Sequence, residues 1–232
     1  LLAFLGISMK NLLALSAIIV VVFVLWDQSV LYPLKLLVVF FHESSHAIAT
    51  VLTGGHVKEM TIDPRLGGKV LSVGGNRFLT LSAGYLGSLV WGSVIYLLAV
   101  RTRFDKLLMA VLGVSVIAMA VVFAGDSFAL GFSALVGGVM IISAWLVPLQ
   151  INDFVLRLIG MVSMLYAPLD IYSDTIQRSH LKSDAFMLAE KFGGTTVIWG
   201  SVWIIISALL ILITIKLSMV KQEKPVEQEP VD

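Results

Sequence analysis

The chain has 232 residues, of which 58% are hydrophobic and only 13% are charged. Soluble domains are about 45–50% apolar and about 25% charged, so this composition excludes an ordinary soluble enzyme. The formal net charge is +1 and there is no cysteine. The near-neutral charge gives no electrostatic basis for binding nucleic acid. Without cysteine, any metal has to be bound by histidine and carboxylate side chains.

The apolar residues are gathered into long runs, and about 20 residues of helix cross the hydrocarbon core of a bilayer. We therefore predict an all-α polytopic protein of the lipid bilayer with six or seven transmembrane helices. The first run is treated as a retained span, because no clear signal-peptide cleavage pattern follows it. The expected spans are 11–26, 34–52, 78–100, 107–124, 128–149, 151–169 and 196–217.

Two loops between these spans differ from the rest of the chain. Residues 53–77 are rich in glycine and alternate apolar with polar residues, which predicts a β-hairpin lying against the membrane or partly within it. Residues 170–195 hold the densest charge in the chain. We expect residues 1–220 to form a single integral membrane domain and the polar segment 221–232 to be a disordered tail.

The second predicted span contains the pattern His42-Glu43-x-x-His46. Residues four apart stack on one face of a helix, so both imidazoles can reach a single ion. This is the pattern of zinc metallopeptidases, in which the glutamate is the general base. Ionisable groups at bilayer depth cost about 2.5 kcal/mol each or more, which favours function over helix packing as their role. We predict that His42 and His46 bind Zn2+ and that Glu43 transfers the proton during peptide hydrolysis.

Other polar residues have simpler interpretations. Ser44 and Ser45 are expected to take part in helix packing or to bond back to the preceding helical turn. Asp126 and Asp153 lie in turn-like contexts, where helix capping is the expected role. His56 and His180 lack a partner at metal-ligand spacing and are expected to be ordinary loop histidines.

Small residues open the third predicted span. Ala83 with Gly87, and Ser88 with Gly92, are small-xxx-small pairs that let helix backbones approach closely in lipid. We expect them to seat this helix beside the one that carries the metal motif. Tyr85 lies in the same stretch, and it is a candidate donor of a hydrogen bond to substrate.

These residues resemble the site-2 protease family of intramembrane zinc metallopeptidases, and especially its short "B-like" branch in bacteria, plants and fungi. The resemblance implies an integral protein of the bacterial cell membrane that uses Zn2+ to cleave membrane proteins or peptides. It extends from about Phe40 to Glu190. It rests on His42-Glu43-x-x-His46, Leu52-Thr53-Gly54-Gly55, Gly74-Gly75, Leu81-Ser82-Ala83-Gly84-Tyr85-Leu86-Gly87-Ser88 and Ser183-Asp184-Ala185.

The third metal ligand of that family is an aspartate on a later membrane helix, usually within Asn-x-x-Pro-x-Asp-Gly. Pro168-Leu169-Asp170 keeps Pro-x-Asp, with leucine and isoleucine at the asparagine and glycine positions. Asp170 also ends the apolar run of the sixth span, so it can lie just inside the membrane boundary, and we favour it as the third ligand. Asp174, one turn further on, and Asp184, in the polar loop, are the alternatives. If Asp174 is not a ligand, we expect it to orient one.

Three functions are weighed on this basis. The first is a zinc endopeptidase that acts within or near the bilayer. The second is a non-proteolytic membrane protein that keeps the fold to bind or regulate a partner, which the incomplete aspartate motif supports. The third is a metal transporter that uses the polar trio as its translocation site. The hairpin either presents an edge to which an extended substrate adds as a strand or is a plain connecting loop. The sequence does not specify an oligomeric state.

Overall fold

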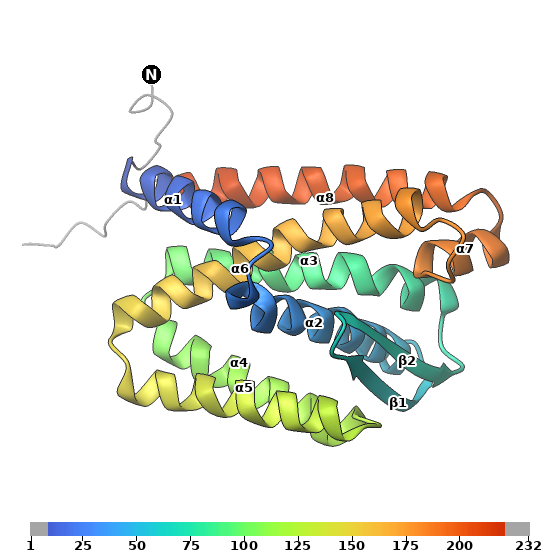
Figure 1. Ribbon diagram of the computed structural model, residues 1–232, viewed down its shortest axis with the longest axis horizontal. Helices are drawn as coiled ribbons and strands as arrows, with labels where there is room; N and C mark the ends of the chain where they lie inside the picture. Colours follow the sequence, from blue (N-terminus) through green and yellow to red (C-terminus); the bar gives the residue numbers. More distant parts are fainter. Residues whose placement is uncertain (1–8, 221–232) are drawn as a thin grey trace, which may run out of the picture.

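Long apolar runs become long helices in a computed structural model, which describes residues 9–220. The helices pack together and a β-hairpin lies beside α2 (Figure 1). In chain order the elements are α1 Met9–Leu25, the short 3-10 helix η1 Ser29–Leu31, α2 Tyr32–Leu52, β1 His56–Asp63, β2 Gly67–Val73, α3 Arg77–Arg101, α4 Asp105–Phe123, α5 Ser127–Leu146, α6 Leu149–Tyr172, the π-helix η2 Ser173–Gln177, α7 Asp184–Phe192 and α8 Thr196–Met219.

Within residues 9–220, six helical segments are long and apolar enough to cross a membrane. This confirms the predicted fold class and indicates an integral membrane protein. Helix α1 is not among the six, because its apolar part, Ser16–Leu25, is shorter. The predicted tail 221–232 lies outside the described residues, and the single domain 1–220 stays a prediction. The six segments are Ser29–Leu52, Arg77–Arg101, Asp105–Phe123, Ser127–Leu146, Leu149–Gln177 and Thr196–Met219.

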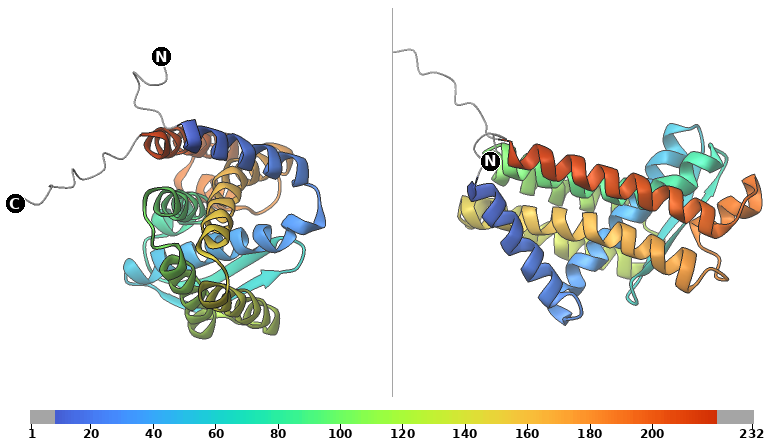
Figure 2. Two further views of the ribbon diagram at one scale, coloured as in Figure 1. Left: turned by 90° about the vertical axis from the view of Figure 1, so that its left-hand side faces the viewer. Right: turned by 90° about the horizontal axis from the view of Figure 1, so that it is seen from above.

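Seen end-on, α3 and α6 lie between α8 on one side and the α4–α5 pair on the other (Figure 2). Close backbone contact holds the central pair together. A Cβ atom added to Gly92 of α3 would lie 2.8 Å from the carbonyl oxygen of Gly160 on α6, and the reverse distance is also 2.8 Å. In lipid, helices associate through such close packing, because lipid tails are as apolar as the side chains.

Helix α2 runs obliquely across this arrangement and is the most enclosed span (Figure 2). Of the most apolar 18-residue stretch of this span, 67% is buried inside the protein, whereas the corresponding share for α8 is 22%. Every residue from Leu36 to Phe41 is buried, although a surface helix would expose one face. The polar residues that follow are therefore surrounded by protein rather than by lipid.

The hairpin predicted between α2 and α3 is confirmed. Strands β1 and β2 are antiparallel, from the pair His56 and Val73 to the pair Asp63 and Gly67. The Tyr32 hydroxyl at the start of α2 donates a hydrogen bond of 2.5 Å to the carbonyl oxygen of Pro64 in the turn. The hairpin thus runs back along α2 from the end of that helix toward its beginning.

The chain after α4 holds the outer edge of β1. The Gly125 amide donates to the carbonyl oxygen of Met60 at 2.8 Å. The Asp126 carboxylate caps α5 by accepting from the Ala129 amide, as predicted, and also accepts from the Ile62 amide at 3.2 Å. The capping role expected of Asp153 was wrong. That residue lies inside α6 and pairs with Arg157 one turn later, because α6 begins at Leu149, five residues earlier than a cap at this position requires.

Candidate metal centre

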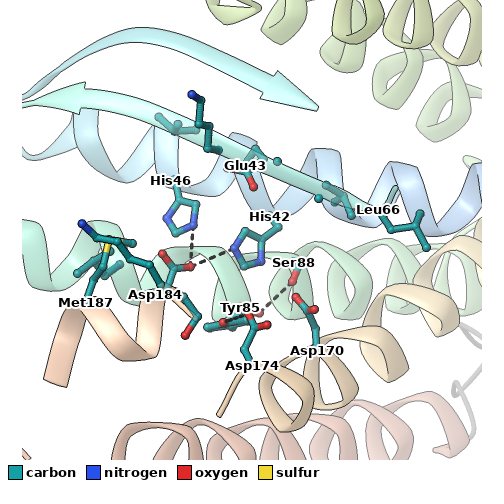
Figure 3. A pocket seen from close by; sticks show the side chains of 18 of the residues that line it. His42, Glu43, His46, Leu66, Tyr85, Ser88, Asp170, Asp174, Asp184 and Met187 are labelled. Carbon is teal, nitrogen blue, oxygen red and sulfur yellow. Dashed lines mark hydrogen bonds and ion pairs between the residues drawn. The ribbon is translucent and has the colours of Figure 1, made fainter. Parts of the chain in front are cut away.

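The helical spacing of the motif brings the two imidazoles together. The ring centres of His42 and His46 lie 4.7 Å apart (Figure 3). The Nδ1 atom of His46 is 2.6 Å from the backbone carbonyl oxygen of Thr80 on α3. A carbonyl oxygen only accepts, so Nδ1 carries the hydrogen, and the Nε2 atom of the neutral ring keeps a free lone pair. Helix α3 therefore fixes the tautomer that a metal ligand needs.

Asp184 completes the cluster from far along the chain. Its Oδ2 atom lies 3.1 Å from Nε2 of His42 and 2.9 Å from Nε2 of His46. Ser183 caps α7 by accepting from the Phe186 amide, and this places Asp184 as the first residue of that helix. Among the described residues, these three offer ligand atoms that all lie within 4.8 Å of one another.

The donor set suits zinc. Two imidazole nitrogens and one carboxylate oxygen are the protein ligands of a common type of catalytic zinc site, which leaves a fourth position for water or substrate. Burial acts to raise the pKa of Asp184, but the neighbouring His46 and His42 imidazoles outweigh burial and hold that pKa below its usual range. Asp184 is therefore a carboxylate, the form that binds a metal.

The two other candidate aspartates take different places. Asp170, which the sequence favoured as the third ligand, lies on α6 and lines the cavity beside the two histidines. It does not belong to the group of His42, His46 and Asp184. Asp174 accepts hydrogen bonds from the Tyr85 hydroxyl at 2.5 Å and from Arg178 at 2.8 Å. The structure thus brings Asp184, named in sequence only as an alternative, to the two histidines.

Glu43 lies on α2 between the two histidines and is covered by the hairpin. Its side chain is 5% exposed, and Oε2 has no hydrogen-bond partner among the described residues. A Cβ atom added to Gly68 of β2 would lie 2.7 Å from Oε1, so strand β2 lies directly against this carboxyl group. Buried polar atoms in proteins are nearly always hydrogen-bonded, and an unpartnered one beside a cavity calls for a water or a ligand.

Glycines on α3 make room for this site. A Cβ atom added to Gly84 would overlap the Nε2 atoms of both His42 and His46, and one added to Gly87 would overlap the side chain of Ser45. The expectation that the small residues of this helix seat it beside the metal-motif helix is confirmed. Ser45 donates to the carbonyl oxygen of Phe41 at 2.6 Å, the back-bonding predicted for it.

A cavity of about 360 Å³ opens beside the cluster. Its walls come from α2, α3, α6, α7 and the hairpin, and they include all three members of the cluster as well as Glu43. Pockets for small ligands occupy about 300–1,000 Å³, and the volume of this cavity lies within that range.

Comparison with known proteins gives one match. The family model described as Peptidase M50B-like matches residues 15–214, which include the histidine motif and Asp184. No curated protein and no solved structure matches the chain. The match confirms the resemblance to the short branch of the site-2 proteases that the sequence motifs indicated. The chain belongs to the peptidase M50B-like family.

Proposed function

We propose that the protein is an intramembrane zinc endopeptidase that hydrolyses peptide bonds of membrane proteins or membrane-associated peptides. The observation that carries the proposal is the cluster of His42, His46 and Asp184 beside the unpartnered carboxyl oxygen of Glu43. Peptidases of this family usually use zinc, and the two imidazoles with one carboxylate fit that ion. A bacterial cell membrane is the proposed location, on the strength of the sequence resemblance alone.

In the proposed reaction, three residues bind the metal ion and Glu43 transfers the proton. When bound by His42, His46 and Asp184, zinc would supply Lewis acidity, which lowers the pKa of water so that hydroxide is available to attack a peptide carbonyl near neutral pH. Glu43 accepts the proton from the attacking water at Oε2 and delivers it to the nitrogen of the leaving amine. The burial of Glu43 under Gly68 keeps bulk water from competing for that proton.

The free edge of β2 is the proposed place for the substrate backbone. Residues Gly67 to Val70 line the cavity, whereas the outer edge of β1 is occupied by the chain around Gly125. An intact transmembrane helix satisfies its own backbone, so it has to unwind before a peptide bond can be cleaved. An extended segment that pairs with β2 regains those hydrogen bonds next to Glu43.

Metal content and peptide cleavage of purified variants test this proposal. We expect about one zinc ion per wild-type chain, as a catalytic site holds. Glu43→Gln should keep the zinc and lose cleavage, whereas Glu190→Gln, at an exposed position, should keep both. Cleavage at the wild-type rate by Glu43→Gln would refute the role of general base.

The third ligand is tested by two matched substitutions. Asp184→Ala should lose the zinc, and Asp170→Ala should retain it, because only Asp184 lies within 3.1 Å of both imidazole nitrogens. The opposite result would show that Asp170 is the ligand.

A further inference from the structure

A chain of hydrogen bonds connects α3 with the segment that leads to Asp184. The Asp174 carboxylate lies at its centre, in the π-helix η2. One of its oxygens accepts from the Tyr85 hydroxyl of α3 at 2.5 Å, and the other accepts from Arg178 at 2.8 Å. Bonds to a charged acceptor are stronger than neutral ones, so the carboxylate fixes both partners.

The ring of Tyr85 contacts the cluster of His42, His46 and Asp184, and its hydroxyl bonds to Asp174 (Figure 3). The residue is 1% exposed, and its ring stands edge-on to His42, with ring centres 5.0 Å apart. On its other side the ring packs against Trp203 of α8 at 5.1 Å. Tyr85 is thus held in one position, in contact with the first proposed ligand.

The chain from Asp174 to Asp184 is a series of short turns. The Arg178 amide donates to the carbonyl oxygen of Ser173, the Leu181 amide to that of Arg178, and the Ser183 amide to that of Leu181, each at 2.8 Å. Ser183 then caps α7, which begins at Asp184. These bonds link η2 to the start of α7 in short steps, so we expect a displacement of Asp174 to displace Asp184 as well.

We propose that Tyr85 and Asp174 are positioning residues, which hold His42 and Asp184 at the separation that zinc binding requires. This inference rests on the proposed function. Neither side chain belongs to the close ligand group. Both act through other residues, Tyr85 through its contact with the His42 ring and Asp174 through the turns that end at Asp184. Partners of metal ligands contribute about 10- to 100-fold to metal affinity in other sites.

Zinc affinity of the full-length protein in detergent, measured by competition with a chelator, tests the proposal. Tyr85→Phe removes the hydroxyl but keeps the ring, and Asp174→Asn keeps the shape but removes the charge. We expect each to weaken zinc binding by about 10- to 100-fold. The double variant should bind about as well as the weaker single variant, because both substitutions weaken or remove the same hydrogen bond, from Tyr85 to Asp174.

Asp153→Asn is the matched control. Asp153 pairs with Arg157 four residues later on α6 at 2.6 Å, the same spacing as the pair of Asp174 with Arg178. This control should bind zinc as the wild type does. The visible absorption spectrum of the Co2+-substituted protein adds a readout of ligand geometry. It should change in Tyr85→Phe and stay the same in the control.

The outcomes separate this inference from the proposed function. A wild-type chain that binds no zinc overturns both. Wild-type affinity and spectrum in Tyr85→Phe and Asp174→Asn overturn the positioning role and leave the peptidase intact. Equal weakening in Asp153→Asn also overturns the positioning role, because it would trace the loss to helix stability in general.

Discussion

Helix α3 passes close to the two imidazoles at Gly84. A methyl group at this position would overlap the Nε2 atoms of both His42 and His46. These atoms lie 3.1 and 2.9 Å from Oδ2 of Asp184, so a displacement of the rings would change the geometry of the cluster. We predict that Gly84→Ala weakens zinc binding while α3 stays helical.

The size of the effect follows from the packing. Forcing one extra carbon into a well-packed site costs about 1–3 kcal/mol. If the imidazoles take up the strain, zinc affinity falls by about 5- to 150-fold, at 1.4 kcal/mol for each factor of ten. Alanine favours a helix over glycine by about 1 kcal/mol, so α3 itself should not be destabilised by Gly84→Ala.

Chelator competition on the purified protein measures this loss, with helix content followed by circular dichroism. Gly138→Ala is the control, since a Cβ atom at Gly138 of α5 meets nothing within 4 Å. We expect wild-type zinc affinity in the control. Equal affinity in Gly84→Ala and the wild type would refute the geometry derived for the cluster.

Asn152→Ala should lower the free energy of unfolding by about 1–3 kcal/mol, because the buried amide bonds to Ser143 and to the carbonyl oxygens of Val147 and Pro148; an unchanged melting temperature would contradict this. Asp126→Ala should cost about 1 kcal/mol and speed hydrogen exchange at the Ile62 amide, which Asp126 holds at 3.2 Å; exchange at the wild-type rate would show that the cap does not hold the hairpin. Removing zinc with a chelator should lower the melting temperature of the wild type, by an amount equivalent to about 2.7 kcal/mol if zinc was present at 100 times its dissociation constant. The melting temperature of Asp184→Ala should not respond, and an equal shift in both proteins would place the metal elsewhere.

Hydrophobic runs predicted the helices well because a bilayer leaves the backbone few alternatives. The third span was expected at 78–100 and the structure has Arg77–Arg101. Helix α7 was missed, since its nine residues are too few to form an apolar run. A signal was nevertheless present, because Ser183 is a favoured cap residue and the buried Ala185 and Leu188 are three residues apart on one helix face.

The candidate site was predictable only where it is local. His42 and His46 follow from a spacing of four within one helix. Asp184 lies 142 residues from His42, and its place depends on how α6, η2 and the following turns pack. The apolar run ends at Asp170, but the helical chain continues past Pro168 to Gln177 before it turns back, and the sequence does not show which aspartate this brings to the two histidines.

The distance along the chain between His42 and Asp184 has a consequence for biosynthesis. A ribosome that adds about 5–20 residues per second needs about 7–28 s to travel from one to the other. Throughout that interval the nascent protein has Glu43 and both imidazoles but not the carboxylate of the cluster. The complete cluster of His42, His46 and Asp184 can therefore form only after α1 to α6 have been synthesised. Ribosome-bound chains stalled before residue 184 should accordingly retain no zinc, and zinc retention by them would contradict this order of assembly.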